Sequence, residues 1–328
     1  MTSQAIFACL VLAASSPMVV AATQVLPSRF EAGLVYVTPV TPSGESLLLY
    51  TDTGGGLFLH EAAAKRLGLE MAPANEAQQQ EGELPPGARL TRLPAFATGK
   101  SIPAPSGHEG HLMVMPAAMG GSMPGMRQID GMLGQAWFAG RIWTWDYPGK
   151  QLRIEADGWR AASDMQRIPL GFKSGDAGER LTDFPRMEIK VDGQPLPMLL
   201  DTGAMTVLTT DAHQILADGL PPDRATSMIA DSIFQAWRKA HPDWRVIEKA
   251  QRGTGAAMIE VPEVEIAGRR IGPVWFTQRP DHAFHQYMSA MMDARVDGAI
   301  GGNAFEHFVM TVDYPNAAAY FRCVRDCR

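Results

Sequence analysis

The chain has few cysteines, few aromatic side chains and no run of basic residues. Of its 328 residues, 3 are cysteine, 8% are aromatic and 20% are charged, and the net charge is −6 at pH 7. Because an acidic chain without clustered lysine and arginine lacks the electrostatic signature of nucleic-acid binding, we expect no nucleic-acid partner. The hydrophobic content of 46% is typical of a soluble globular protein, and the length suits one large domain or two ordinary ones.

Charged side chains are absent from residues 1–22. The apolar stretch 5–14 and the small residues at 20–22 are typical of a secretory signal peptide, which we assign to 1–22. An uncleaved anchor is the alternative, because 5–22 is nearly long enough to span a bilayer. No later stretch is long and apolar enough to do so. We therefore expect a periplasmic or extracellular protein without stable membrane insertion once the signal is removed.

The three cysteines of the chain lie near its two ends. Cys9 lies in the predicted signal, so Cys323 and Cys327 would be the cysteines of the mature chain. Two nearby cysteines in an exported protein most simply form one disulfide, which would pin the C-terminal tail. Two free thiols on a frayed tail are the alternative.

Three short sequence motifs each occur twice in the chain, in the same order. They are Asp-Thr-Gly at 52–54 and 201–203, Asp-Gly-x-x-Gly at 130–134 and 297–301, and Asp-Tyr-Pro at 146–148 and 313–315. The copies of the second and third motifs lie 167 positions apart, and those of the first lie 149 apart. The second half has therefore gained 18 residues between its first two motifs. Such a pattern predicts an internal duplication of lobe size.

The repeated motifs resemble those of the pepsin-like and retropepsin-like aspartic peptidases. In that family a strand enters each Asp-Thr/Ser-Gly loop, and a later hydrophobic-hydrophobic-Gly strand passes beside it. The later elements here are 132–134 and 299–301. The resemblance implies a mostly β, two-lobed pepsin-like acid protease fold, each lobe a retropepsin-like β-barrel with short helices.

The duplication also predicts the division of the chain. We expect an N-terminal lobe over 23–160 and a C-terminal lobe over 161–328, with a helical insertion at about 213–253. Apolar residues recur at roughly helical spacing over 223–240, which predicts an amphipathic helix there.

The family resemblance implies an aspartic endopeptidase. Two adjacent carboxylates share one proton, so the ionised one can activate a water while the protonated one polarises the scissile carbonyl. By resemblance, Asp52 and Asp201 fill these roles in a cleft between the lobes. The supporting residues would be Thr53 and Thr202, which lock the two loops together, and Gly54 and Gly203, which let backbone approach a carboxylate.

We expect no cofactor and no metal, a peptide or protein substrate, and a monomer, because one chain supplies both aspartates.

Two departures from the family pattern affect the expected activity. Gly55 and Ala204 follow the motifs where acid-optimum pepsins often have serine, so the resemblance implies a mildly acidic to neutral optimum. No tyrosine lies between Asp52 and Asp130, where pepsins carry a flap tyrosine. Phe96 is the aromatic residue of the expected flap region, 89–111, and is a candidate flap residue.

Other interpretations remain open. The Asp-Thr-Gly motifs could be ordinary turns, or the fold could belong to a weakly active or inactive protein that binds peptide or a protein partner. A different class is copper binding through the His/Met-rich loop 108–126. The residues that suggest a metal are His108 and His111, His282 and His285, and the methionines Met113, Met115, Met119, Met123 and Met126.

Overall fold

The computed structural model describes residues 22–81, 84–85, 87–106, 108–116 and 127–328. The predicted signal segment therefore lies outside the described residues, apart from Ala22. Met119, Met123 and Met126 of the suggested metal loop also lie outside them. Among the described residues, no helix is both long and apolar enough to cross a membrane.

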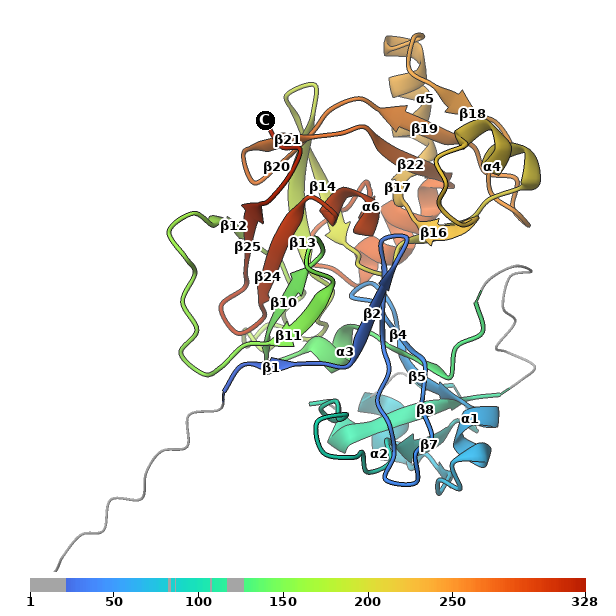
Figure 1. The fold of residues 1–328 in the computed structure, drawn as a ribbon, viewed down its shortest axis with the longest axis vertical. Helices are drawn as coiled ribbons and strands as arrows, with labels where there is room; N and C mark the ends of the chain where they lie inside the picture. Colours follow the sequence, from blue (N-terminus) through green and yellow to red (C-terminus); the bar gives the residue numbers. More distant parts are fainter. Residues whose placement is uncertain (1–21, 82–83, 86, 107, 117–126) are drawn as a thin grey trace, which may run out of the picture.

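Strands dominate the described part of the chain and form three large sheets (Figure 1). The N-terminal lobe holds an eight-stranded sheet. In spatial order its strands are β2 (Ser28–Glu31), β3 (Leu34–Val37), β4 (Leu49–Thr51), β9 (Gly131–Leu133), β5 (Leu57–His60), β8 (His111–Met115), β7 (Arg89–Arg92) and β6 (Ala72–Pro73).

The C-terminal lobe holds a nine-stranded sheet and a small two-stranded one. The large sheet runs in the order β18 (Val246–Ile247), β19 (Met258–Val261), β22 (Val274–Arg279), β17 (Ser227–Ala230), β23 (Gly298–Ile300), β14 (Gln194–Leu200), β13 (Arg186–Val191), β20 (Val264–Ile266) and β21 (Arg269–Ile271). The small sheet pairs β15 (Met205–Val207) with β16 (Asp223–Ala225).

The third sheet joins the two lobes. Its six strands are β1 (Gln24–Val25), β11 (Gln151–Ile154), β10 (Ile142–Asp146), β24 (Phe308–Asp313), β25 (Ala318–Cys323) and β12 (Gln166–Pro169). At its centre β10 and β24 pair antiparallel, with Thr144 opposite Thr311. These two residues are 167 positions apart, the same offset as the second and third motifs, and their hydroxyl oxygens lie 2.8 Å apart. The halves of the duplication therefore meet at this pair.

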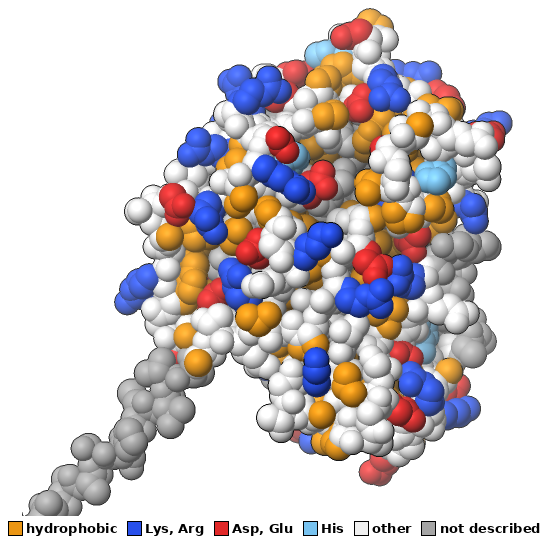
Figure 2. Space-filling view, in the orientation of Figure 1, with side chains coloured by type: hydrophobic (Ala, Val, Ile, Leu, Met, Phe, Trp, Pro, Cys, Tyr) orange, Lys and Arg blue, Asp and Glu red, His pale blue; other side chains and the backbone are white. Residues whose placement is uncertain are grey.

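Short helices complete the fold, as predicted. They are α1 (Glu61–Arg66), α2 (Glu76–Glu81), the 3₁₀ turn η1 (His108–Gly110), α3 (Gln135–Phe138), α4 (Thr210–Leu216), α5 (Asp231–Ala240), the π-helix η2 (Ala283–Met288) and α6 (Gly302–Phe305). Figure 2 shows one face of the molecule, on which acidic and basic side chains are interspersed rather than gathered by sign.

The helix predicted over 223–240 is only half right. Residues 231–240 form α5, but 223–225 and 227–230 are the strands β16 and β17. Consequently the insertion at about 213–253 is a mixture of strand and helix. Met228 and Ile229 fitted a helical period, yet β17 lies inside the sheet between β22 and β23. A short strand covered on both faces has a continuous apolar run, which periodicity alone cannot distinguish from helix.

The third motif builds matched hairpin turns. Asp146 Oδ1 accepts a hydrogen bond from Gly149 N at 2.8 Å, and Asp313 Oδ1 accepts one from Asn316 N at 3.1 Å. The tyrosines that follow each aspartate are buried in the core. The largest fully buried side chains there are Trp137, Trp143, Trp145, Tyr314, Phe138, Phe234, Phe276, Phe305, Phe308 and Phe321.

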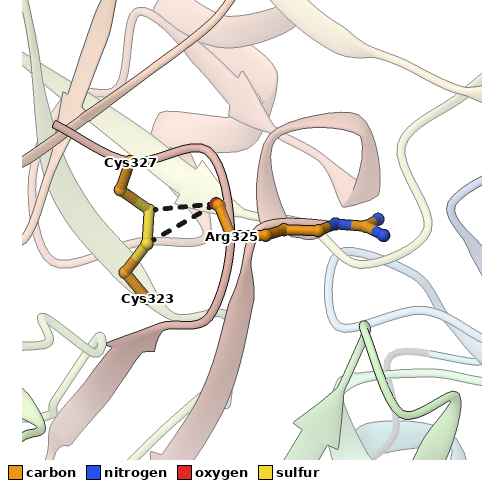
Figure 3. The surroundings of a disulfide bond; sticks show 3 residues. All are labelled: Cys323, Arg325 and Cys327. Carbon is orange, nitrogen blue, oxygen red and sulfur yellow. Dashed lines mark hydrogen bonds between the residues drawn. A yellow bond between two sulfur atoms is a disulfide. The ribbon is translucent and has the colours of Figure 1, made fainter.

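The predicted disulfide is present and ties down the tail. Cys323, the last residue of β25, is bonded to Cys327, and the carbonyl oxygen of Arg325 lies 3.5 Å from each sulfur (Figure 3). Beyond the disulfide, Arg328 and Arg270 exchange two backbone hydrogen bonds of 2.9 and 3.0 Å. The chain end is therefore attached to β21.

Candidate active site

The two aspartates stand at equivalent places in the two lobes. β4 runs parallel to β9, and β14 runs parallel to β23, so each strand that enters an Asp-Thr-Gly loop lies beside the strand of the later motif. This confirms the arrangement that the family resemblance implied. Asp52 N donates to Leu133 O at 3.1 Å, and Asp201 N donates to Ile300 O at 3.0 Å. The same backbone framework thus fixes both aspartates.

The structure brings the two carboxyl groups into contact. A side-chain hydrogen bond joins Asp52 and Asp201, which are 8% and 9% exposed. Each also accepts a bond from its own loop, from Gly54 N at 2.8 Å and from Gly203 N at 3.0 Å. We call Asp52 and Asp201 the aspartate pair.

Burial and mutual repulsion hold a proton on this pair. Burial raises the pKa of Asp52, although the hydrogen bonds from Asp201 and the Gly54 amide oppose the shift. Burial raises the pKa of Asp201 well above its ordinary value, and the charge of Asp52 and their shared hydrogen bond raise it further. Two carboxyl groups in contact do not both ionise readily, so they titrate as one unit that retains a proton above the usual range of aspartate.

The two threonines join the loops across the lobe boundary. Thr202 N donates to Thr53 Oγ1 at 2.9 Å, and Thr53 N donates to Thr202 Oγ1 at 3.2 Å. Thr53 Oγ1 also donates to Leu200 O at 2.6 Å. Reciprocal buried bonds of this kind hold the two carboxyl groups at a fixed separation.

Each loop glycine faces the carboxyl group of the opposite lobe. A Cβ atom on Gly203 would lie 2.1 Å from Asp52 Cγ, and one on Gly54 would lie 2.7 Å from Asp201 Cγ. Both distances are far below van der Waals contact, so any side chain at these positions would displace a carboxyl group. The third residue of each motif thereby makes room for the other motif's aspartate.

One residue at this site was not predicted. The Tyr50 hydroxyl, which is buried, donates to Gly203 O at 2.7 Å, so a side chain from one lobe holds the loop of the other. Tyr36 packs against it, with ring centroids 5.2 Å apart. Strand alternation from Leu49 was the available signal, because it sends Tyr50 to the face opposite the main core.

Further contacts join the lobes beside the pair. The turn between β2 and β3 reaches the C-terminal lobe, where Ala225 N donates to Ala32 O at 2.9 Å (Figure 1). Arg127 N donates to Asp223 Oδ2 at 2.8 Å, and the Arg127 side chain forms an ion pair with Glu31. Two segments of the N-terminal lobe thus contact the same strand of the C-terminal lobe, β16.

Phe96, the candidate flap residue, packs partly buried against the main core. Its neighbour Ala97 donates its N–H to Val40 O at 2.8 Å, and Val40 N donates to Lys100 O at 3.1 Å. Further along this segment, Pro103 O accepts a bond from Trp137 Nε1 at 2.9 Å. These contacts attach the segment to the body of the lobe and give Phe96 a packing role.

Two of the histidines that suggested a metal contact other side chains of the protein. Arg92 Nε donates to His111 Nε2 at 3.1 Å, and His285 Nε2 lies 3.2 Å from Asp297 Oδ1. Within the described residues, no three His, Cys, Asp or Glu side chains gather as metal ligands would.

Comparison with solved structures finds similar proteins. Basic 7S globulin from soybean has a TM-score of 0.50 and 11% identity to this chain, over 92% of this chain and 95% of the globulin. An aspartic proteinase from Irpex lacteus has a TM-score of 0.46 and 11% identity, over 93% of this chain and 98% of that one. No protein-family model and no curated protein sequence matches.

The predicted fold class is confirmed. The chain is mostly β and has the two-lobed pepsin-like fold over nearly its whole length. Identity of 11% shows the fold alone, so activity has to be argued from the aspartate pair itself.

Proposed function

We propose that this protein is an aspartic endopeptidase whose aspartate pair, Asp52 and Asp201, activates a water for peptide hydrolysis. The observation that carries the proposal is the contact between two buried carboxyl groups, one from each Asp-Thr-Gly loop. Because such a pair retains one proton, it offers a general base and a general acid at the same place.

The reaction would run in two stages. The ionised carboxylate takes a proton from water as the water oxygen adds to the scissile carbonyl carbon, and the protonated carboxyl group donates to the carbonyl oxygen. The carbon–nitrogen bond then breaks and the departing amine takes up a proton from the pair, while a hydroxyl of the tetrahedral intermediate returns a proton to the pair as the carboxylic acid forms. The step balances without a cofactor or a metal. We assign the roles to the pair as a unit, because the two carboxyl groups titrate together.

The proposal extends to substrate and location. The substrate would be a peptide or protein segment in extended form, bound in part by main-chain hydrogen bonds between the lobes. A monomer would suffice, since one chain provides both aspartates. The uncharged leader at 1–22 supports a periplasmic or extracellular location.

The test is cleavage of a mixed peptide library by the mature chain from about pH 3 to about pH 8. Asp52→Asn and Asp201→Asn would be assayed beside the wild type, with circular dichroism to establish that each is folded. We expect cleavage by the wild type, lost in both variants.

Two other outcomes would contradict the proposal. Cleavage that survives either substitution would show that the pair is not the catalyst. A folded wild type that cleaves nothing across this pH range would favour the alternative, a pepsin-like protein that binds peptide or a partner.

A further inference from the structure

Arg279, the last residue of β22, has a mostly buried side chain without a charged partner. Among the described residues no carboxylate lies within ion-pair distance of its guanidinium. A buried arginine is ordinarily paired, as Arg224 is with Asp218 at 2.5 Å. An unpaired one therefore needs an explanation.

Strand alternation places Arg279 on the face of β22 that looks toward the second aspartate. Thr277 shares this face, because side chains two residues apart lie on the same side of a strand. Thr277 Oγ1 lies 2.9 Å from Thr226 Oγ1, and Thr226 N donates to Ala204 O at 3.0 Å. Ala204 directly follows the second Asp-Thr-Gly, so this face adjoins the loop that carries Asp201.

One guanidinium nitrogen has both of its hydrogens in hydrogen bonds. Arg279 Nη1 donates to Gln251 Oε1 at 2.8 Å and to Gln278 O at 3.0 Å, which accounts for both of its hydrogens. Gln251 is 3% exposed and also accepts a bond from Thr254 Oγ1 at 2.9 Å, so this anchor is itself held in place.

The other edge of the guanidinium remains available. Nε and Nη2 of Arg279 have no partner among the described residues, and neither is sealed from solvent. These two nitrogens form the side of arginine that binds a carboxylate with two parallel hydrogen bonds.

The charge on Arg279 persists at physiological pH, and Asp201 interacts with it electrostatically. Burial lowers the pKa of Arg279 to about 10, and the charge of Asp201 opposes that shift. Because Asp201 is the one carboxylate that acts on it, the guanidinium lies in the electrostatic field of the pair.

We propose that Arg279 forms a carboxylate-binding subsite beside the aspartate pair, which selects peptides with an acidic group near the scissile bond. The group would be an Asp or Glu side chain or the C-terminal carboxylate of a short peptide. The inference rests on the proposed endopeptidase activity and adds a substrate class to it.

The first experiment compares matched peptides. A peptide that the wild type cleaves is prepared with Glu or Gln at each position around the cleavage site, and with a C-terminal carboxylate or amide. We expect a kcat/KM ratio of about tenfold or more in favour of the acidic member at one position, as a charged hydrogen-bonded pair provides. Arg279→Gln is expected to abolish the ratio.

The controls separate this role from general effects of charge or folding. Arg238→Gln removes an exposed arginine that is paired with Glu248 on the same lobe, and we expect it to keep the ratio. Arg279→Glu is expected to reverse the preference toward Lys at the same position. A ratio that is equal in the wild type and Arg279→Gln overturns the proposal, whether or not peptides are cleaved.

A binding experiment distinguishes failure of the subsite from failure of the peptidase. Asp52→Asn keeps the Asp201 loop, and its affinity for the Glu and Gln peptides is measured by fluorescence anisotropy with Arg279 intact or changed to Gln. If nothing is cleaved but acidic peptides bind more tightly through Arg279, the subsite stands and the endopeptidase does not. If the acidic and amide peptides bind equally, the subsite is wrong.

Discussion

At the scale of single residues, the space around Gly203 sets the position of Asp52. A Cβ at Gly203 would lie 2.1 Å from Asp52 Cγ, so Gly203→Ala must push that carboxyl group away from Asp201. We predict that kcat/KM falls by at least about 100-fold, because catalysis is sensitive to displacements of about 1 Å. Steady-state kinetics on a cleaved peptide would measure this.

Gly56→Ala is the matched control. A Cβ at Gly56 meets nothing within 4 Å, and this residue also lies beside an Asp-Thr-Gly loop. We expect its kinetics to stay near those of the wild type. Equal losses in the two variants would show that backbone stiffness, rather than displacement of Asp52, is responsible.

The raised pKa of Asp201 makes a second prediction, on stability. From the ordinary value of 3.8 up to its higher folded value, Asp201 is protonated in the folded chain and ionised in the unfolded one. Unfolding then releases a proton, so folded stability falls as pH rises through this range. Asparagine stays neutral and removes this penalty.

We therefore expect Asp201→Asn to raise the melting temperature at pH 7 by at least about 2 °C, with a gain that shrinks toward pH 4. Differential scanning calorimetry across this range would measure the gain. Asp211→Asn, at an exposed position, is the control and should not show such a trend. A gain that is independent of pH would contradict the assignment to ionisation.

Whether a site residue could be predicted depended on whether it stands inside a repeated motif. Asp52, Asp201 and their threonines and glycines stand inside a repeated tripeptide, so their proximity followed from the duplication. Tyr50 and Arg279 belong to no motif. Tyr50 reaches a loop 153 positions later, and Arg279 approaches Asp201 through the sheet order of four strands. Strand alternation gives the face on which Tyr50 lies, but neither residue's contact partner can be derived from local sequence.

At the scale of elements, the two threonines that join the Asp-Thr-Gly loops make different numbers of hydrogen bonds. Thr53 Oγ1 accepts from Thr202 N and donates to Leu200 O, whereas Thr202 Oγ1 accepts from Thr53 N. Thr53→Val therefore leaves two buried backbone groups unpaired, and Thr202→Val leaves one. We predict a cost of roughly 1–3 kcal/mol for Thr202→Val and about twice that for Thr53→Val.

Urea denaturation would measure both costs. Thr53→Ser keeps the hydroxyl and should recover most of the stability lost in Thr53→Val. Equal costs for the two valine variants would mean that the threonine bonds are equivalent in solution.

Helices and strands could be predicted where a sequence pattern is compatible with only one kind of structure. The placement of β9 beside β4 and of β23 beside β14 followed from the family resemblance, and the structure shows both pairs to be parallel. The span 223–240 failed, because β17 is an interior strand whose apolar run carries no strand period. What distinguishes β17 from α5 is its pairing with β22 and β23, which are contributed by residues far along the chain.

At the scale of the whole molecule, contacts between equivalent residues mark the axis of the duplication. Thr144 and Thr311 meet at the centre of the joining sheet, and Thr53 and Thr202 exchange bonds beside the aspartate pair. A residue can touch its own equivalent only near the axis that relates the two halves. An approximate two-fold axis therefore runs from the six-stranded sheet to the aspartate pair.

The Thr144–Thr311 contact predicts strong coupling between the lobes. Both side chains are buried, so Thr144→Val or Thr311→Val alone leaves one hydroxyl without its partner, at a cost of about 1–3 kcal/mol. The double variant removes both hydroxyls and places two apolar groups of similar shape against each other. We expect it to be nearly as stable as the wild type.

A double-mutant cycle by urea denaturation measures this coupling as the difference between the double variant and the sum of the single ones. Peptide cleavage by the double variant is the accompanying readout, because the axis leads from this pair to Asp52 and Asp201. Costs that simply add would show that the hydroxyls act independently. The lobes would then be held by the backbone pairing of β10 and β24 and by the contacts beside the aspartates.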